Sequence, residues 1–321
     1  MSDLPEETPV PVEVEDLLTW LRVERGRSSN TLVAYRRDLR GYTAWLARRG
    51  LGLGDVTEAH IGEYLAHLRA GGLATASQKR ALVSVRGLHR FLAEEHEGHP
   101  DPAAEVEMPK VPRGLPKALS EEEVGRLLAS VTGDRPLDRR DRAILEVLYG
   151  TGLRISELVG LSLGDVDLDA GLIRAFGKGA KERIVPVGRF ATAALVSWLG
   201  AGGRPELEPV RWARRGDAEA LFLNTRGGRL SRQGAWMVVH RAGDRVGLEG
   251  RLSPHVLRHS CATHMLDHGA DVRTVQELLG HASISTTQVY TLVSTERLLS
   301  VYRSAHPRAT LERPADAGPV E

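Results

Sequence analysis

Residues 253–290 read SPHVLRHSCATHMLDHGADVRTVQELLGHASISTTQVY, a helical pattern with clear start and stop signals. Ser253-Pro254 is a typical helix start, because serine caps free N–H groups and proline suits the first helical position. Asp271 opens a second helix in the same way, and Gly280 ends it. The pattern predicts two helices joined by a short turn, with polar side chains gathered near their ends.

Six polar residues occupy positions that a packed apolar core does not explain. Arg154 lies in the stretch TGLRISEL, residues 151–158, at a turn-to-helix junction. Residues 172–187 contain two β-rich runs around a glycine turn, which predicts a hairpin with Lys178 at its tip. The six are Arg154, Lys178, His255, Arg258, His281 and Tyr290. Each residue by itself has an ordinary explanation, such as an ion pair of Arg154 with Glu157. Together they are the candidate catalytic residues.

The first hundred residues have the apolar spacing of amphipathic helices. A leucine stripe follows the acidic start, and helix starts are predicted at Ser28–Asn30 and at Thr57. A longer helix is expected over 76–95, with leucines and Val85 facing inward. Its expected outward face is basic and includes Lys79, Arg80, Arg86 and Arg90. The sequence therefore predicts a small helical bundle.

Prolines break the helical pattern between residues 98 and 117 and predict an extended linker. The expected limits are a helical domain over 1–97 and a second domain over 118–321. The second domain begins with a capping-box start at Ser120–Glu123 and combines helices with the hairpin. A Gly/Arg-rich loop is expected over 201–219. The predicted fold is mainly α, with a small β-sheet or hairpin.

Charge is unevenly distributed along this 321-residue chain, although its net value is only +1. Residues 1–16 hold six acids and no base, and 307–321 sum to −1, so 17–306 carry +8. A basic body suits a polyanionic partner, but solvated helix faces explain the same composition. There is no apolar run of the ~18 residues that a membrane span needs, and no signal-peptide pattern. Because the lone Cys261 cannot form an internal disulfide, we expect a cytoplasmic protein.

The six candidates, in this order and spacing, resemble the signature of the tyrosine recombinase (phage integrase) family. The stretch from His255 to Tyr290 is similar to the Xer branch, and so is Gly177-Lys178-Gly179. The ending around 295–309 is closer to the D type than to the C type of that branch. The resemblance implies a SAM-like core-binding domain followed by an α+β catalytic domain.

The resemblance also implies a role for each candidate. Two arginines, Arg154 and Arg258, clamp the phosphoryl oxygens through bidentate hydrogen bonds that a lysine cannot reproduce. His281 adds a donor there. Tyr290 is the nucleophile with His255 as its base, and Lys178 protonates the leaving 5′-oxygen. The product is a 3′-phosphotyrosyl enzyme whose ester keeps the bond energy, so neither nucleotide nor metal cofactor is expected.

The implied partner is duplex DNA at a specific recombination site. A second, C-type recombinase in a cyclic heterotetramer and an activating DNA translocase are also implied, with the last helix docked on a neighbouring protomer. Chromosome dimer resolution at segregation is then the expected function. A mobile-element integrase and a catalytically idle DNA-binding protein on the same fold remain alternatives.

A zinc site is the remaining alternative, because histidines recur through residues 255–268. At about 100° per residue, His255 and His259 fall on one helix face, and His264 and His268 on the opposite one. The four cannot hold one ion. We expect His259 to be a buried, hydrogen-bonded histidine that braces the active site, His264 and His268 to be packing or surface residues, and Cys261 to fill the core.

Overall fold

The computed structural model describes residues 10–95, 100–109, 118–177, 182–280 and 292–310. The chain forms two compact units, Met1–Gly114 and Leu115–Glu321. Of the expected linker, 98–117, only residues 100–109 are described, and there Ala103 and Val106 are buried against the first unit. The exact domain limits stay a prediction. Within the described residues no helix is long and apolar enough to cross a membrane.

The first unit is a helical bundle, as predicted. Its helices are α1 (Val12–Val23), α2 (Ser29–Ala47), α3 (Glu58–Ala70) and α4 (Thr75–Glu95), with a 3-10 turn η1 (Leu53–Asp55). The predicted caps form, since Ser28 and Thr57 accept hydrogen bonds from the first turns of α2 and α3. Tyr42, Trp45 and Leu82 are fully buried between the helices.

Two of the four basic residues expected on the outward face of α4 are paired within the first unit. Arg80 forms a bidentate pair with the buried Asp38, with both N–O distances at 2.9 Å. Arg86 donates through Nε to the carbonyl of Ala103 (2.9 Å) and through Nη2 to that of Val106. These two arginines therefore stabilise the bundle and the following segment, and of the four only Lys79 and Arg90 remain free of such contacts in the described chain.

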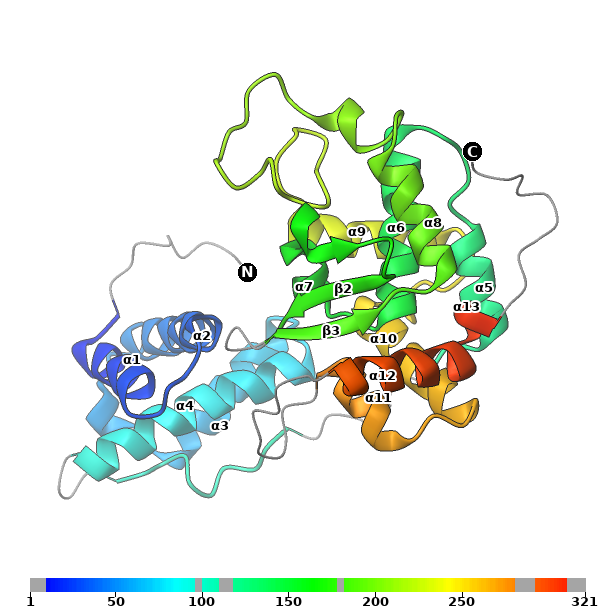
Figure 1. Cartoon of the computed structure of the whole chain (residues 1–321). Coiled ribbons are helices and arrows are strands. Elements are labelled where there is room, and N and C mark those ends of the chain that lie inside the picture. The colour runs from blue at the N-terminus through cyan, green and yellow to red at the C-terminus, as the bar shows by residue number, and fades with distance from the viewer. Residues whose placement is uncertain (1–9, 96–99, 110–117, 178–181, 281–291, 311–321) are drawn as a thin grey trace. The chain divides into compact units, whose positions relative to one another are not determined.

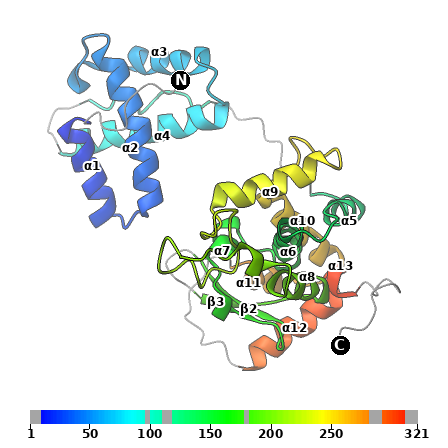
Figure 2. The ribbon, with the colours of Figure 1, turned by 90° about the horizontal axis from the view of Figure 1, so that it is seen from above.

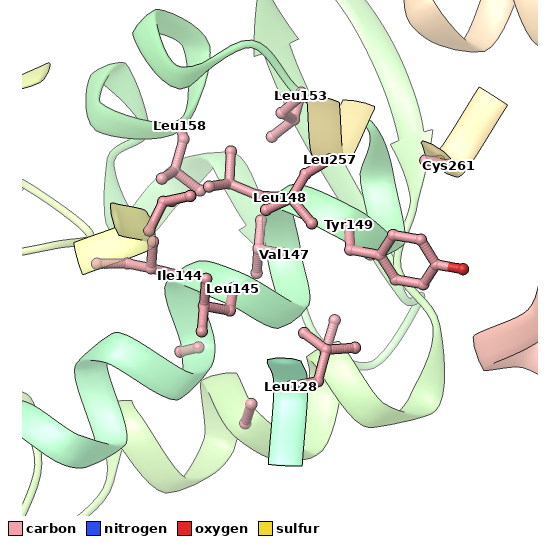
Figure 3. Close-up of a cluster of buried hydrophobic side chains, with 14 of the residues drawn as sticks. Leu128, Ile144, Leu145, Val147, Leu148, Tyr149, Leu153, Leu158, Leu257 and Cys261 are labelled. Atoms are coloured by element: carbon pink, nitrogen blue, oxygen red, sulfur yellow. The ribbon is translucent and has the colours of Figure 1, made fainter. Parts of the chain in front are cut away.

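The second unit surrounds the buried helix α6 (Figures 1 and 2). Its helices are α5 (Glu121–Ala129), α6 (Pro136–Thr151), α7 (Ile155–Gly160), α8 (Arg189–Leu199), α9 (Arg232–Asp244), α10 (Pro254–Asp267), α11 (Val272–Leu279), α12 (Leu292–Ala305) and α13 (Pro307–Thr310), with 3-10 turns η2 (Leu163–Asp165) and η3 (Arg204–Leu207). Ile144, Leu148 and Leu153 meet Leu257 of α10 in the core (Figure 3). The capping box between Ser120 and Glu123 is confirmed.

The predicted hairpin is confirmed and belongs to a three-stranded antiparallel sheet of order β1-β2-β3. Strand β2 (Leu172–Phe176) pairs with β3 (Glu182–Pro186), and Ile173 lies opposite Val185. Ile173 and Ala175 face the core, whereas Arg174 and Phe176 are exposed. Strand β1 (Val166–Asp167) was not predicted, because a strand of two residues is too short to show an alternation of apolar and polar side chains.

Helix α12 packs on α10, α11 and β3 of its own unit. Its Leu298, Tyr302 and Ala305 are buried there, and the Tyr302 hydroxyl donates to the carbonyl of Gly150 (2.9 Å). These three side chains are thus packed within the chain. The expectation that the last helix docks on a neighbouring protomer stays a prediction.

Candidate active site

Three arginines from different elements converge on the C-terminal end of α11. Arg183 of β3 donates through Nε to the carbonyl of Leu278 (3.0 Å), and Arg258 of α10 through Nη2 to that of Leu279 (2.6 Å). Arg154 donates through Nη2 to the carbonyl of Gly280 (3.2 Å). A helix C-terminus carries partial negative charge, so cations are favourable there. Consecutive carbonyls thus hold the guanidinium groups side by side.

Arg154 owes its position to two left-handed glycines. Gly152 ends α6 with a φ of 60°, and Arg154 then becomes the N-cap of α7. A Cβ on Gly152 would lie 2.6 Å from a methyl carbon of Leu279, so only glycine allows α6 and α11 to approach this closely. Gly280 ends α11 with a φ of 68° and turns its carbonyl to Arg154.

Arg258 is one of two buried members of the group, with 6% of its surface exposed. Its Nη1 donates to the carbonyl of Gly152 (2.6 Å), which ties α10 to the turn before Arg154. Burial, together with the neighbouring Arg154 and Arg183, lowers the pKa of Arg258 to about 10, and Glu157 opposes this shift. Arg258 therefore stays charged at neutral pH while carrying an unfavourable excess of positive charge, which an anion would relieve.

Among the described residues one carboxylate, that of Glu157, organises the site. From the sequence alone we expected Glu157 only to pair with Arg154. It forms a bidentate pair with Arg183 (2.9 and 2.8 Å) and also accepts from Arg154 Nη1 (2.8 Å). Burial alone would raise the pKa of Glu157, but the hydrogen bonds from Arg183 and from the Arg154 backbone hold it below the ordinary value. One negative charge faces three positive ones, so the site favours an anion.

Arg183 was missed as a site residue. It is 5% exposed, yet it lies in a strand whose neighbours Ile184 and Val185 are apolar. A charged residue in a short run of otherwise buried strand positions is the signal that could have found it, since buried charges are almost always paired.

The predicted site residues divide into two groups. Arg154 and Arg258 are brought together, with the side chain of Arg154 41% exposed and that of Arg258 buried. His255 lies exposed on α10, one turn before Arg258. Lys178, His281 and Tyr290 lie outside the described residues. The catalytic roles of all six residues stay predictions.

The expectation for His259 was wrong, whereas those for Cys261, His264 and His268 are confirmed. His259 is exposed, so it is not the buried brace. The buried one is His264, whose Nδ1 lies 2.9 Å from the Tyr149 hydroxyl and whose Nε2 lies 2.8 Å from the Leu119 carbonyl oxygen. His268 is a surface residue beside Glu121, as expected. Cys261 is fully buried in the core (Figure 3), as expected. No group of three potential metal ligands exists among the described residues.

Comparisons with known proteins show the family of the chain. The model described as "Phage integrase family" matches residues 117–297, and "Phage integrase, N-terminal SAM-like domain" matches 14–96. The Tyrosine recombinase XerD of Mycobacterium tuberculosis is 50% identical over 311 residues, which cover 93% of this chain and 98% of the relative. The XerD of Corynebacterium glutamicum is 48% identical over 301 residues, covering 91% and 97%.

A solved structure has the same fold. It is the XerH site-specific recombinase bound to palindromic difH substrate in a post-cleavage complex. The likeness covers 90% of this chain and 84% of that one, with a TM-score of 0.63 and 25% identity. The fold predicted from the sequence, a SAM-like helical domain with a catalytic domain of this family, is confirmed.

Proposed function

We propose, since this chain belongs to the phage integrase family and is a tyrosine recombinase, that it cuts and rejoins duplex DNA at a specific site through Tyr290. The observation that carries the proposal is the convergence of Arg154 and Arg258 on adjacent carbonyls at the end of α11. Two guanidinium groups so placed suit the two non-bridging oxygens of one phosphate. His281 follows Gly280 directly in the sequence.

The proposed reaction is an in-line displacement at phosphorus. The Tyr290 oxygen forms a bond to phosphorus and gives its proton to His255, while the bond to the 5′-oxygen breaks. Lys178 supplies the proton that makes this oxygen a free 5′-hydroxyl. Negative charge on the phosphoryl oxygens rises during the attack, and the arginine pair stabilises it without reorganisation. Attack by a 5′-hydroxyl of another strand reverses each step and rejoins the DNA.

Tyr290 needs such help because a free phenol has a pKa of about 10 and is almost entirely protonated at neutral pH. His255 is suited to act as the base, since it is exposed one helical turn before Arg258. A neutral imidazole can accept the phenolic proton near pH 7.

The biological role we propose is chromosome dimer resolution at segregation. The support is the level of identity to relatives named Tyrosine recombinase XerD, which extends over both domains. On this proposal the chain works in a cyclic heterotetramer with a second Xer-type recombinase, and a DNA translocase activates the complex. Its partner is duplex DNA, and it needs neither metal nor nucleotide.

The experiment uses a nicked duplex that loses its 5′-hydroxyl fragment after cleavage and so traps the covalent complex. We expect the wild type to give a denaturation-resistant protein–DNA adduct and Tyr290→Phe to give none, with salt-sensitive DNA binding retained. Tyr35→Phe, on the first unit, is the matched control and should cleave like the wild type. Undiminished adduct from Tyr290→Phe would overturn the proposal.

A second experiment tests the acid. Lys178→Ala should cleave ordinary DNA slowly, but it should regain cleavage on a substrate whose leaving oxygen is replaced by sulfur, because a thiolate leaves without a proton. If the sulfur substrate gives no recovery, the acid is another residue.

A further inference from the structure

A basic loop between η3 and α9 has no part in the proposed chemistry. We define the arginine loop as residues 208–216, with the sequence EPVRWARRG. Arg211, Arg214 and Arg215 are all exposed, and none of them has an ion-pair partner among the described residues. The acid of the loop, Glu208, is already paired with Arg204. Three positive charges are therefore presented to solvent without compensation.

The base of the arginine loop is held firmly. Arg204 is buried, and it donates through Nε to the carbonyl of Ala220 (3.0 Å) and through Nη2 to that of Ala218 (2.6 Å). Its guanidinium also lies 5.9 Å from the ring of Trp212. The buried Asp217 accepts from the backbone N–H of Arg229 (3.2 Å). The loop thus extends from a fixed stem, which comprises Arg204, residues 217–221 and Arg229 (Figure 1).

The same stem is joined to the active site through α7. The Arg229 guanidinium donates to the carbonyls of Gly160 (2.9 Å) and Leu161 (2.8 Å), where α7 ends. The backbone N–H of Leu221 also donates to Leu161 (3.0 Å). Helix α7 begins directly after Arg154 and has six residues, so it separates Arg154 from the stem by only about 9 Å. One rigid turn-and-a-half of helix therefore links the two groups of arginines.

We propose that the arginine loop binds the sugar–phosphate backbone of the duplex whose scissile phosphate Arg154 holds. This inference rests on the proposed function. Three unpaired guanidinium groups suit phosphates, which are the densest array of negative charge on DNA. Contacts to phosphate carry no sequence information, so binding of the loop to the backbone adds affinity that does not depend on base sequence.

The test compares two triple variants that remove equal charge. Arg211→Gln/Arg214→Gln/Arg215→Gln neutralises the loop. Arg126→Gln/Arg273→Gln/Arg303→Gln neutralises exposed arginines of α5, α11 and α12. Binding to a duplex that carries the site and its flanks is measured at several salt concentrations. Each lost phosphate contact lowers the log–log salt slope by roughly 0.9, so the loop variant should lose about 2–3 in slope and the control less than about 1.

The outcomes separate this inference from the proposed function. If the wild type forms no covalent adduct with a nicked site, the proposed function fails. If it forms the adduct but the two triple variants share one salt slope, the arginine loop does not bind the backbone. Unchanged DNA binding by the loop variant, with defects only when a second recombinase is present, would assign the loop to a protein partner and also overturn the inference.

Discussion

Replacing Arg183 with methionine removes the bidentate partner of a buried carboxylate while keeping a side chain of similar length. Glu157 is 5% exposed and loses two of its hydrogen bonds, at 2.9 and 2.8 Å. Removing one partner of a buried pair costs ~3–5 kcal/mol. Glu157 keeps its bonds to the Arg154 backbone and side chain, so we expect the lower end, about 3 kcal/mol.

The cost should depend on pH, with a sign fixed by Glu157. In the wild type the pKa of Glu157 is lowered, so its stabilising contribution is present above the unfolded value and is lost as pH falls through the folded one. Without Arg183, burial of Glu157 dominates and raises the pKa. Protonation then relieves the buried charge, and the difference in stability between wild type and variant should shrink from pH 7 to pH 5.

Urea unfolding of both proteins, followed by circular dichroism at pH 7 and pH 5, measures this difference. Arg174→Met on the adjacent strand β2 is the matched control. The Arg174 side chain is 45% exposed, so its ion pair with Asp165 lies at the surface and should be worth less than about 1 kcal/mol. Adding Glu157→Gln to Arg183→Met should recover part of the loss. Equal costs for the Arg183 and Arg174 variants, or a cost independent of pH, would refute the role given to Glu157.

Further expectations concern other buried groups. Arg86→Met frees the carbonyls of 103–106, so limited proteolysis should cut there faster than in the wild type or in Arg90→Gln; equal rates would contradict the clamp. Burial raises the pKa of Cys261 to about 12, so iodoacetamide at pH 8 should label it only in urea, and native labelling would contradict this. Burial lowers the pKa of His306 to about 3, whereas the unfolded chain binds this proton near pH 6.5. The free energy of unfolding should therefore fall below about pH 6.5, and it should fall less in His306→Gln. The same pH dependence in both proteins would contradict this expectation.

Local chemistry explains why so much of the fold could be predicted. Ser28, Ser120 and Ser253 each cap a helix with a hydroxyl three residues before the N–H that it binds, and this spacing is visible in the sequence. Gly152 and Gly280 end helices in the left-handed conformation. Such signals need no knowledge of what lies across the core.

Contacts between distant segments explain the misses. His259 and His264 lie about 140° apart around α10, and only the packing of α6 and Leu119 decides that His264 is the buried one. Arg80 and Arg86 look like free cations until Asp38 and the carbonyls after α4 are brought to them. The partnership of Glu157 with Arg183 spans 26 positions and has no local pattern.

The measurement that tests the arginine clamp most directly is single-turnover cleavage of a nicked duplex by Arg154→Lys. Arg154 is 41% exposed, so the variant should fold, and lysine keeps the charge but not the bidentate geometry. We expect Arg154→Lys to cleave about 10²–10³-fold more slowly, because one transition-state donor is lost. The Kd for DNA should stay nearly unchanged, and Arg174→Lys should cleave at the wild-type rate. A Kd that weakens while bound DNA is cleaved at the wild-type rate would contradict it.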